Sequence, residues 1–467
     1  MSKFLWKGEQ VIGIINGHGP SDWSASGVSI DTRTLKKGDI FFALAGPNYD
    51  GHQFISSAIK KGASIVISNA PSLAFKDKVI IVSDVFNALI SLGRFSRKRN
   101  KGKIIAITGS SGKTTVKEML ALSLSKSGKI HYSEASYNNK IGVSLSLSRM
   151  PIDSDFSIFE LGMNNAGEIS YLSNLVEPHI ALINNTGNAH IGNLNSKKEI
   201  EKAKMEIVSG ITSNGKLIIN ENVSLSSYPK KLFENKNLKI LKFGHKKNSN
   251  FILEKYSYSS GLSLIDATIN RANISYSLKA PGSHMAMNSI AVIGVCFLLG
   301  VSPDVSKQTI SNFESMDGRG KIHDLSIIGK KIEVIDESYN ANPESTKSSI
   351  NLLSEIDFLK SKRKILVFGD MLELGNFSKE MHIEIASFIN ESDVDLVFCI
   401  GSEIKNLWDN LILSKRGYHS IDPEILINSL KNKLKENDLV LLKGSSKSGI
   451  KIIFNALMEE QLNRNIA

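Results

Sequence analysis

The sequence has few cysteines and no long hydrophobic run, and these two absences exclude several classes of protein. Only two cysteines, Cys296 and Cys399, occur among 467 residues, and they lie in separate apolar segments. Such a chain has neither a disulfide framework nor the spacing of a cysteine metal site. Its longest apolar stretch, Ser289–Val301, is shorter than the roughly 20 residues of a transmembrane helix. Because the N-terminus also lacks a signal-peptide pattern, we expect a cytoplasmic protein without membrane insertion.

Long blocks of one charge are also absent. The chain has 57 Lys and Arg against 46 Asp and Glu, a formal net charge of +11. A basic excess favours anionic partners, but by itself it does not distinguish nucleic acid from nucleotides or phosphorylated metabolites. No block of Lys and Arg is longer than Arg97–Lys98–Arg99, and no basic stripe carries interleaved aromatic residues. We therefore do not expect nucleic-acid binding.

Short β-branched runs alternate with helical patterns along the whole chain, and this rhythm predicts an α/β fold with parallel sheets. Two glycine-containing joints, at Ser96–Lys103 and Asp317–Lys321, divide the sequence. They predict three α/β domains, spanning residues 1–100, 101–318 and 319–467. Residues 237–280 read as short strands and suggest a small antiparallel insertion in the second domain. The other expected strands are Ile104–Thr108, Phe156–Glu160, Ile180–Asn184, Ile365–Phe368, Leu396–Ile400 and Leu439–Leu442.

The strongest motif is Thr108-Gly109-Ser110-Ser111-Gly112-Lys113-Thr114-Thr115, between an expected strand and an expected helix. Glycines let backbone N–H groups surround phosphate oxygens, and the helix N-terminus adds a positive dipole end. Lys113 can reach the terminal phosphates and a following hydroxyl can ligate Mg²⁺. The motif is shorter than the usual P-loop, since Ile107 stands where the first glycine is expected. The alternative is a simple Gly/Ser turn before a basic helix.

Three further residues are weaker candidates. Glu160 ends an apolar strand, where α/β proteins form ligand sites, and its carboxylate suits Mg²⁺. It could equally be a strand-end charge that reaches water. His190 follows the next apolar strand, and a loop histidine is usually just hydrogen-bonded or solvated. Lys204 lies in a mixed-charge helical segment that resembles any solvated helix face.

Taken in order, the short phosphate loop, Glu160, His190 and Lys204 resemble the Mur ligases of peptidoglycan assembly. These enzymes use ATP to join an amino acid or dipeptide to a UDP-linked muramoyl substrate. Three motifs are similar to the branch of the family that adds D-alanyl-D-alanine: Tyr137–Gly142, Asp336–Pro343 and Gly369–Gly375. The Asp-Tyr-Ala-His-Thr-Pro and Asp-Asn-Pro-Arg signatures of the branch that adds the third residue are absent. Taken singly, each of the three motifs could be an ordinary loop.

The N-terminal segment extends the resemblance. Ser29–Arg33, Gly38–Leu44 and Asp50–His52 are similar to the UDP-binding domain of these ligases. Gly282, His284 and Asn288 match a segment near the nucleotide, although Met285 replaces a residue that is polar in many relatives. The implied fold is a UDP-substrate-binding α/β domain, a central P-loop ATPase-like domain and a C-terminal Rossmann-like domain.

The resemblance also implies the ligands and a role for each residue. The expected reaction joins D-alanyl-D-alanine to UDP-N-acetylmuramoyl-tripeptide through an acyl phosphate, with ATP and Mg²⁺ as cofactors and the chain acting as a monomer. Lys113, His190 and Lys204 are implied as catalytic. Thr114, Glu160, His190 and Lys204, the last as a carbamate, are implied as metal ligands. The implied nucleotide contacts are Gly109, Ser110, Ser111, Gly112, Lys113, Thr114, Thr115, Asn288, Arg319, Asp336, Tyr339 and Asn340. The implied peptide-substrate contacts are Ser29, Asp31, Arg33, Asp50, Asn138 and Asn139.

Two alternatives remain at this point. A folylpolyglutamate-type amide ligase would share the phosphate loop, but it would not be expected to carry the N-terminal UDP-type domain. A basic P-loop protein that acts on nucleic acid would bind polynucleotides with a strong dependence on salt.

Overall fold

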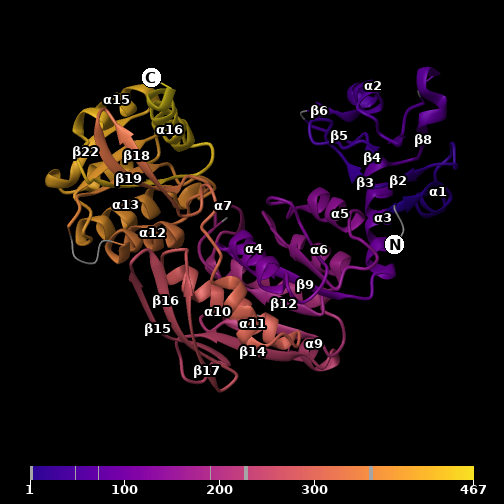
Figure 1. Ribbon diagram of the computed structural model, residues 1–467, viewed down its shortest axis with the longest axis horizontal. Coiled ribbons are helices and arrows are strands. Elements are labelled where there is room, and N and C mark those ends of the chain that lie inside the picture. The colour runs from indigo at the N-terminus through magenta and orange to yellow at the C-terminus, as the bar shows by residue number, and fades with distance from the viewer. Residues whose placement is uncertain are drawn as a thin grey trace.

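The computed structural model describes residues 4–47, 49–71, 73–189, 191–225, 230–356 and 361–466. Figure 1 shows three α/β domains that follow one another along the chain, coloured from indigo through magenta to yellow. The described residues contain no helix that is both long and apolar enough to cross a membrane. The three-domain α/β fold expected from the sequence is confirmed.

The N-terminal domain contains a parallel four-stranded sheet in the order β3-β4-β7-β8. Its strands are β3 (Gly27–Ser29), β4 (Asp39–Phe42), β7 (Ile65–Ser68) and β8 (Val79–Ile81), and its helices are α1 (Gly8–Ile15), α2 (Ile55–Lys60) and α3 (Val85–Arg99). Two small ribbons flank it, β1 (Trp6–Lys7) with β2 (Ser24–Ala25), and β5 (Ala45–Gly46) with β6 (Tyr49–Asp50). Helix α3 ties this domain to the next one, because Arg97 Nε donates to the carbonyl of Val176 at 2.7 Å.

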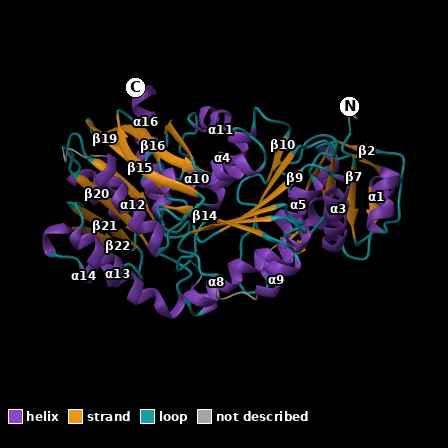
Figure 2. Cartoon of the chain, turned by 90° about the horizontal axis from the view of Figure 1, so that it is seen from below, coloured by secondary structure: helices purple, strands orange, loops and turns teal. Residues whose placement is uncertain are grey.

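A nine-stranded sheet forms the centre of the molecule, in the order β10-β11-β9-β12-β13-β14-β15-β16-β17. Its strands are β9 (Lys103–Thr108), β10 (Ile130–Tyr132), β11 (Phe156–Glu160), β12 (Ile180–Ile183), β13 (Lys216–Asn220), β14 (Lys239–Gly244), β15 (Phe251–Ser259), β16 (Leu262–Ile269) and β17 (Ala272–Leu278). Its helices are α4 (Lys113–Leu124), α5 (Lys140–Ser148), α6 (Glu168–Val176), α7 (Ile191–Leu194), α8 (Lys197–Met205), α9 (Lys230–Asn235), α10 (Ser283–Leu298) and α11 (Pro303–Ile310). Figure 2 shows α4 and α10 on one side of this sheet and α8 and α9 on the other.

The antiparallel strands expected in residues 237–280 are part of this same sheet. Strand β14 pairs in parallel with β13, and β15 to β17 then continue as an antiparallel extension. Buried apolar residues alternate along β16, which explains why its bounds, Leu262–Ile269, could be predicted from the sequence.

The C-terminal domain has a six-stranded sheet in the order β18-β19-β23-β20-β21-β22, parallel except for the β18–β19 hairpin. Its strands are β18 (Lys321–Ile327), β19 (Lys330–Glu337), β20 (Lys364–Gly369), β21 (Leu396–Ile400), β22 (Arg416–Ser420) and β23 (Leu439–Lys443). Its helices are α12 (Pro343–Ile356), α13 (Ser378–Glu391), α14 (Lys405–Asn410), α15 (Pro423–Lys433) and α16 (Ile450–Ile466).

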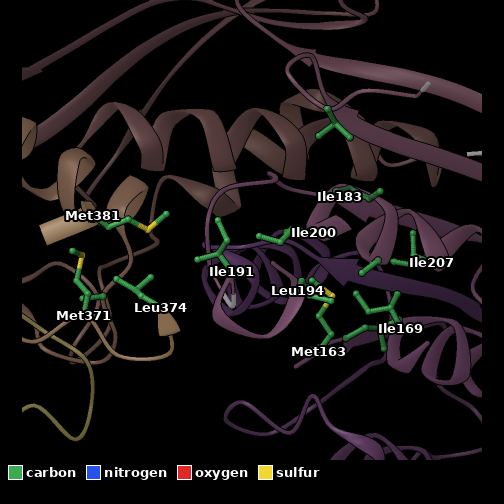
Figure 3. Packing of buried hydrophobic residues seen from close by; sticks show 14 of the residues in the cluster. Met163, Ile169, Ile183, Ile191, Leu194, Ile200, Ile207, Met371, Leu374 and Met381 are labelled. Atoms are coloured by element: carbon green, nitrogen blue, oxygen red, sulfur yellow. The ribbon is translucent and has the colours of Figure 1, made fainter. Parts of the chain in front are cut away.

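The central and C-terminal domains share one hydrophobic cluster. Figure 3 shows Ile191 and Ile200 of the central domain close to Leu374 and Met381 of the C-terminal domain. The contact is tight, because a Cβ atom on Gly192 would lie 2.7 Å from the backbone nitrogen of Gly375. Burial of apolar side chains thus holds the C-terminal domain against the loops that follow β12.

Candidate active site

The phosphate loop joins β9 to α4, as the motif predicts. Gly112 begins the helix with φ of +76°, a conformation that favours glycine. A Cβ atom at this position would also lie 2.5 Å from Asn184 Nδ2. Both the backbone angle and the lack of space therefore require the glycine that the motif supplies.

The loop after β12 forms hydrogen bonds with the phosphate loop. The Ser110 hydroxyl donates to the carbonyl of Gly187 at 3.0 Å, and its Oγ accepts the Gly187 N–H at 2.8 Å. The Ser111 N–H donates to Asn185 Oδ1 at 2.9 Å. These hydrogen bonds tie both serines of the phosphate loop to the loop after β12.

Helix α10 approaches the same loop. Asn184 Nδ2 donates to Ser111 O at 3.1 Å and to Asn288 Oδ1 at 2.9 Å. Asn288 is buried at the start of α10, so the two segments that the sequence motifs placed near the nucleotide lie together.

Lys113 is the first residue of α4, and its ammonium folds back over the loop. Its Nζ donates to the carbonyl of Gly109 at 2.7 Å. Burial lowers the pKa of Lys113, while the nearby Glu160 carboxylate opposes this effect. A partly desolvated cation at the mouth of a phosphate loop can bind terminal phosphate oxygens.

Thr114 and Glu160 form the pair of oxygen ligands that Mg²⁺ would need. Thr114 Oγ1 donates to Glu160 Oε2 at 2.7 Å, and Asn138 Nδ2 donates to Glu160 Oε1 at 2.7 Å. Glu160 is buried at the end of β11. Among the described residues, no group of three or more His, Cys, Asp or Glu could hold a metal by itself. A site with two protein oxygens suits Mg²⁺, which takes its remaining ligands from phosphates and water.

Lys204 lies in α8 and is 1% exposed. Burial lowers its pKa well below the ordinary value, and the positive charge of Lys113 acts in the same direction. Burial and the neighbouring cation thus both disfavour the charged form of this amine. His190 lies outside the described residues.

The opposite wall of the site comes from the C-terminal domain. The Arg319 guanidinium stacks on the Tyr339 ring, 3.9 Å from the ring centre. The Tyr339 hydroxyl donates to Ser136 Oγ at 2.7 Å, and Ser136 Oγ lies 3.4 Å from Thr114 Oγ1. Ser136 therefore links the phosphate helix to the C-terminal domain.

A cavity of about 1290 Å³ lies between these walls. The expected residues in its wall are Ser110, Ser111, Gly112, Lys113, Thr114, Thr115, Asn138, Asn139, Glu160, Asn288, Arg319, Tyr339 and Asn340. The cavity is thus lined by residues from the central and C-terminal domains, with a cation and a carboxylate–hydroxyl pair at its phosphate end.

Family models cover most of the chain. The Mur ligase middle domain matches residues 107–296, the Mur ligase glutamate ligase domain residues 318–446, and the Mur ligase family catalytic domain residues 24–94. The chain belongs to the Mur ligase family. A UDP-N-acetylmuramoyl-tripeptide–D-alanyl-D-alanine ligase of Rickettsia prowazekii is 34% identical over 431 residues, 91% of this chain and 93% of the relative. The ligase of the same name from Escherichia coli is 30% identical and covers 96% of this chain and 98% of the relative.

Solved structures agree with this assignment. A crystal structure of MurF from Acinetobacter baumannii has a TM-score of 0.84, with 26% identity over 97% of this chain and 99% of that chain. Because the match covers 97% of this Mur ligase, its three domains together have the same fold as that structure.

Gly109 and Lys204 do not line the cavity, and neither does Asp336, an expected nucleotide contact. Asp336 is buried, and its Oδ2 accepts the Gly318 N–H at 2.7 Å. Its Oδ1 accepts the hydroxyl of Ser338 at 2.6 Å. One oxygen thus holds the glycine turn that carries Arg319, and the other holds Ser338.

The expected substrate residues of the N-terminal domain lie apart from this cavity. Arg33 pairs with Asp31 at 2.6 Å, and its side chain is 87% exposed. This hydrogen bond lowers the pKa of Asp31. Ser29 Oγ donates to the carbonyl of Asp31 at 3.0 Å, whereas Asp50 accepts from His52. Ser29, Asp31 and Arg33 thus form a separate polar group and Asp50 pairs with His52, whereas Asn138 and Asn139 belong to the main cavity.

Several wall residues were not expected from the sequence. Ser136, Glu344 and Lys443 lie in the wall, and Lys443 Nζ donates to the carbonyl of Asn340 at 2.7 Å. No spacing rule relates residues so far apart, and only the fold brings them together. Asn184 and Asn185 had a usable signal, since they directly follow an apolar strand next to the phosphate-loop strand.

Proposed function

We propose that the chain joins D-alanyl-D-alanine to UDP-N-acetylmuramoyl-tripeptide with ATP, giving the UDP-linked pentapeptide used in peptidoglycan synthesis. The observation that carries the proposal is the Thr114–Glu160 pair beside Lys113, at the phosphate end of a cavity between two domains. The names and coverage of the relatives support the choice of substrates over those of a folylpolyglutamate-type ligase.

The chemistry requires activation of a carboxylate. An amine cannot displace a carboxylate oxygen at neutral pH, because that oxygen is a poor leaving group. ATP therefore transfers its γ-phosphoryl group to the terminal carboxylate of the tripeptide. The bond between the γ-phosphorus and the β-γ bridging oxygen breaks, and ADP is the leaving group. The amine of D-alanyl-D-alanine attacks the carbonyl carbon of the resulting acyl phosphate and loses a proton. Inorganic phosphate then leaves, and the amide bond remains.

Residues of this chain position these groups rather than react with them. Lys113 binds the β- and γ-phosphates, and the backbone of Gly109–Thr115 surrounds them. Asn288, Arg319, Tyr339 and Asn340 contact the rest of the nucleotide. Asp336 acts on it indirectly, through the turn that carries Arg319.

Four residues would hold Mg²⁺ in this proposal. Thr114 and Glu160 would hold one ion, and His190 would contribute to a second. Lys204, as a carbamate formed with CO₂, would support the ions with a negative charge where an ammonium would repel them. Bound Mg²⁺ neutralises charge on the phosphates during transfer.

The remaining assignments concern the peptide substrate and the setting. Ser29, Asp31, Arg33 and Asp50 bind the UDP group, and Asn138 and Asn139 contact the peptide part near Glu160. The domains span residues 1–100, 101–318 and 319–467, and the enzyme works as a monomer in the cytoplasm.

A direct assay tests the function. Purified protein is mixed with ATP, Mg²⁺, UDP-N-acetylmuramoyl-tripeptide and D-alanyl-D-alanine, and the products are identified by mass. We expect the pentapeptide and one ADP per peptide bond. A second reaction replaces the peptide substrates with a folate and glutamate. ATP-dependent glutamate addition there, with no pentapeptide in the first reaction, would contradict the proposal.

A further inference from the structure

Glu344, near the start of α12, has no part in the chemistry proposed above, yet its side chain reaches into the other domain. Its Oε1 accepts the N–H of Asn188 at 2.9 Å. Its Oε2 is buried and has no hydrogen-bond partner within the described part of the chain. One of the two carboxylate oxygens thus accepts a hydrogen bond from the backbone of the loop after β12.

The loop is shaped to receive this carboxylate. A Cβ atom on Gly187 would lie 2.6 Å from Glu344 Cδ and 2.7 Å from Oε2. Such contacts are too short for any side chain, so glycine at 187 lets the carboxylate lie directly against the backbone. The contact therefore depends on both domains and is lost if α12 moves away.

The same glycine contacts the phosphate loop directly. Gly187 exchanges two hydrogen bonds with the Ser110 hydroxyl, at 2.8 and 3.0 Å. Ser110 lies in the phosphate loop and in the cavity wall. A chain of direct contacts thus runs from Glu344 through residues 187–188 to the loop that surrounds phosphate.

We infer that Glu344 is a positioning residue, and that it couples the position of the C-terminal domain to the conformation of the phosphate loop. When α12 is docked, the carboxylate fixes the backbone at residues 187–188, and this backbone fixes Ser110. The inference rests on the proposed function only in assigning the phosphate loop to ATP.

Two substitutions separate the hydrogen bond from the charge. In Glu344→Gln the amide oxygen can still accept the Asn188 N–H, whereas in Glu344→Ala the acceptor is lost. We expect Glu344→Ala to weaken the affinity for a non-hydrolysable ATP analogue with Mg²⁺ by about 10-fold, the scale of one hydrogen bond to a charged group. Glu344→Gln should restore the affinity to within roughly twofold of the parent protein. Calorimetry on the full chain, without peptide substrates, measures both.

A matched control lies on the same helix. Glu355 also accepts hydrogen bonds across the domain boundary, from the N–H and hydroxyl of Ser283 at 2.9 and 2.8 Å. Glu355→Ala removes a similar interdomain contact that does not lead to Ser110. We expect this variant to bind the ATP analogue with nearly the parent affinity.

Three results would overturn the inference: unchanged affinity in Glu344→Ala, equal losses in the Gln and Ala variants, or equal losses in Glu344→Ala and Glu355→Ala. The second would mean that the charge of Glu344 acts rather than the hydrogen bond, and the third that domain docking in general is responsible. Because the assay uses only the nucleotide, failure of the parent protein to make pentapeptide would contradict the proposed function without deciding the role of Glu344.

Discussion

The hydroxyl of Tyr339 donates a 2.7 Å hydrogen bond to Ser136 Oγ, across 203 residues of sequence and between two domains. Ser136 lies beside Thr114, while Tyr339 carries the stacked guanidinium of Arg319. Arg319 Nη2 also donates to Ser136 Oγ, at 3.5 Å, so two side chains of the C-terminal domain contact the serine that lies beside the phosphate helix.

Removing that hydroxyl should slow the reaction while leaving the stack intact. In Tyr339→Phe the ring remains under Arg319, but the contact to Ser136 is lost. We expect kcat to fall by about 3- to 10-fold, the scale of one neutral hydrogen bond. Steady-state kinetics measure this, with Tyr418→Phe, at an exposed tyrosine of β22, as the control. An unchanged kcat in Tyr339→Phe would show that the contact has no part in catalysis.

The sequence could predict the sheet strands because their apolar runs are continuous and buried on both faces. Phe156–Glu160 and Leu396–Ile400 agree residue for residue with β11 and β21. The phosphate loop was equally predictable, since its glycines and lysine follow one another directly. Both the strands and the phosphate loop could be predicted because each depends on residues that are close together in the sequence.

The cavity's other wall could not be predicted in the same way. Ser136 is one serine among many in the sequence, and only the fold brings Tyr339, 203 residues further on, against it. Asp336 illustrates the opposite case. It lies in a recognisable motif, but two backbone turns use its oxygens, and no spacing rule distinguishes a turn-forming carboxylate from a ligand-binding one.

Lys113→Ala should abolish ligation without unfolding the protein. The side chain contributes positive charge at the phosphate site and no part of a hydrophobic core. We expect a loss of about 100-fold or more in kcat, the scale of removing one electrostatic donor. Lys126→Ala, at an exposed residue just beyond α4, is the control for charge alone. Near-normal activity of a folded Lys113→Ala enzyme would remove the phosphate-loop assignment.

Lys204→Ala should be nearly inactive and should recover in part with acetate or formate, which can replace the carbamate. Lys204→Arg should not recover, because its permanent charge and bulk occupy the same space. Carbamate formation needs the neutral amine, and because burial lowers the pKa of Lys204, this form is retained to a lower pH than in an ordinary lysine. As the pH falls through that lowered pKa, the ammonium form replaces it and activity should fall.

The rescue is measured as initial rate against carboxylate concentration at fixed ionic strength. Chloride at the same ionic strength is the control. Full activity of Lys204→Ala without added carboxylate would refute the carbamate, although the ligase assignment would stand.

Arg33→Ala should raise the KM for the UDP substrate and leave the KM for ATP nearly unchanged. Arg33 lies in the N-terminal domain, outside the main cavity, so it can contribute binding but no contact to the reacting groups. Measuring each KM with the other substrates saturating separates the two effects. A shift in the ATP KM alone would contradict the placement of the UDP group on this domain.

The central claim, that a carboxylate is activated by phosphoryl transfer before amide formation, is tested most directly with isotopic oxygen. UDP-N-acetylmuramoyl-tripeptide labelled with ¹⁸O in its terminal carboxylate is incubated with the enzyme, ATP, Mg²⁺ and D-alanyl-D-alanine, and the released phosphate is analysed by mass spectrometry. The account predicts pentapeptide together with inorganic phosphate that carries one ¹⁸O atom from the carboxylate. Pentapeptide formed with unlabelled phosphate would contradict it.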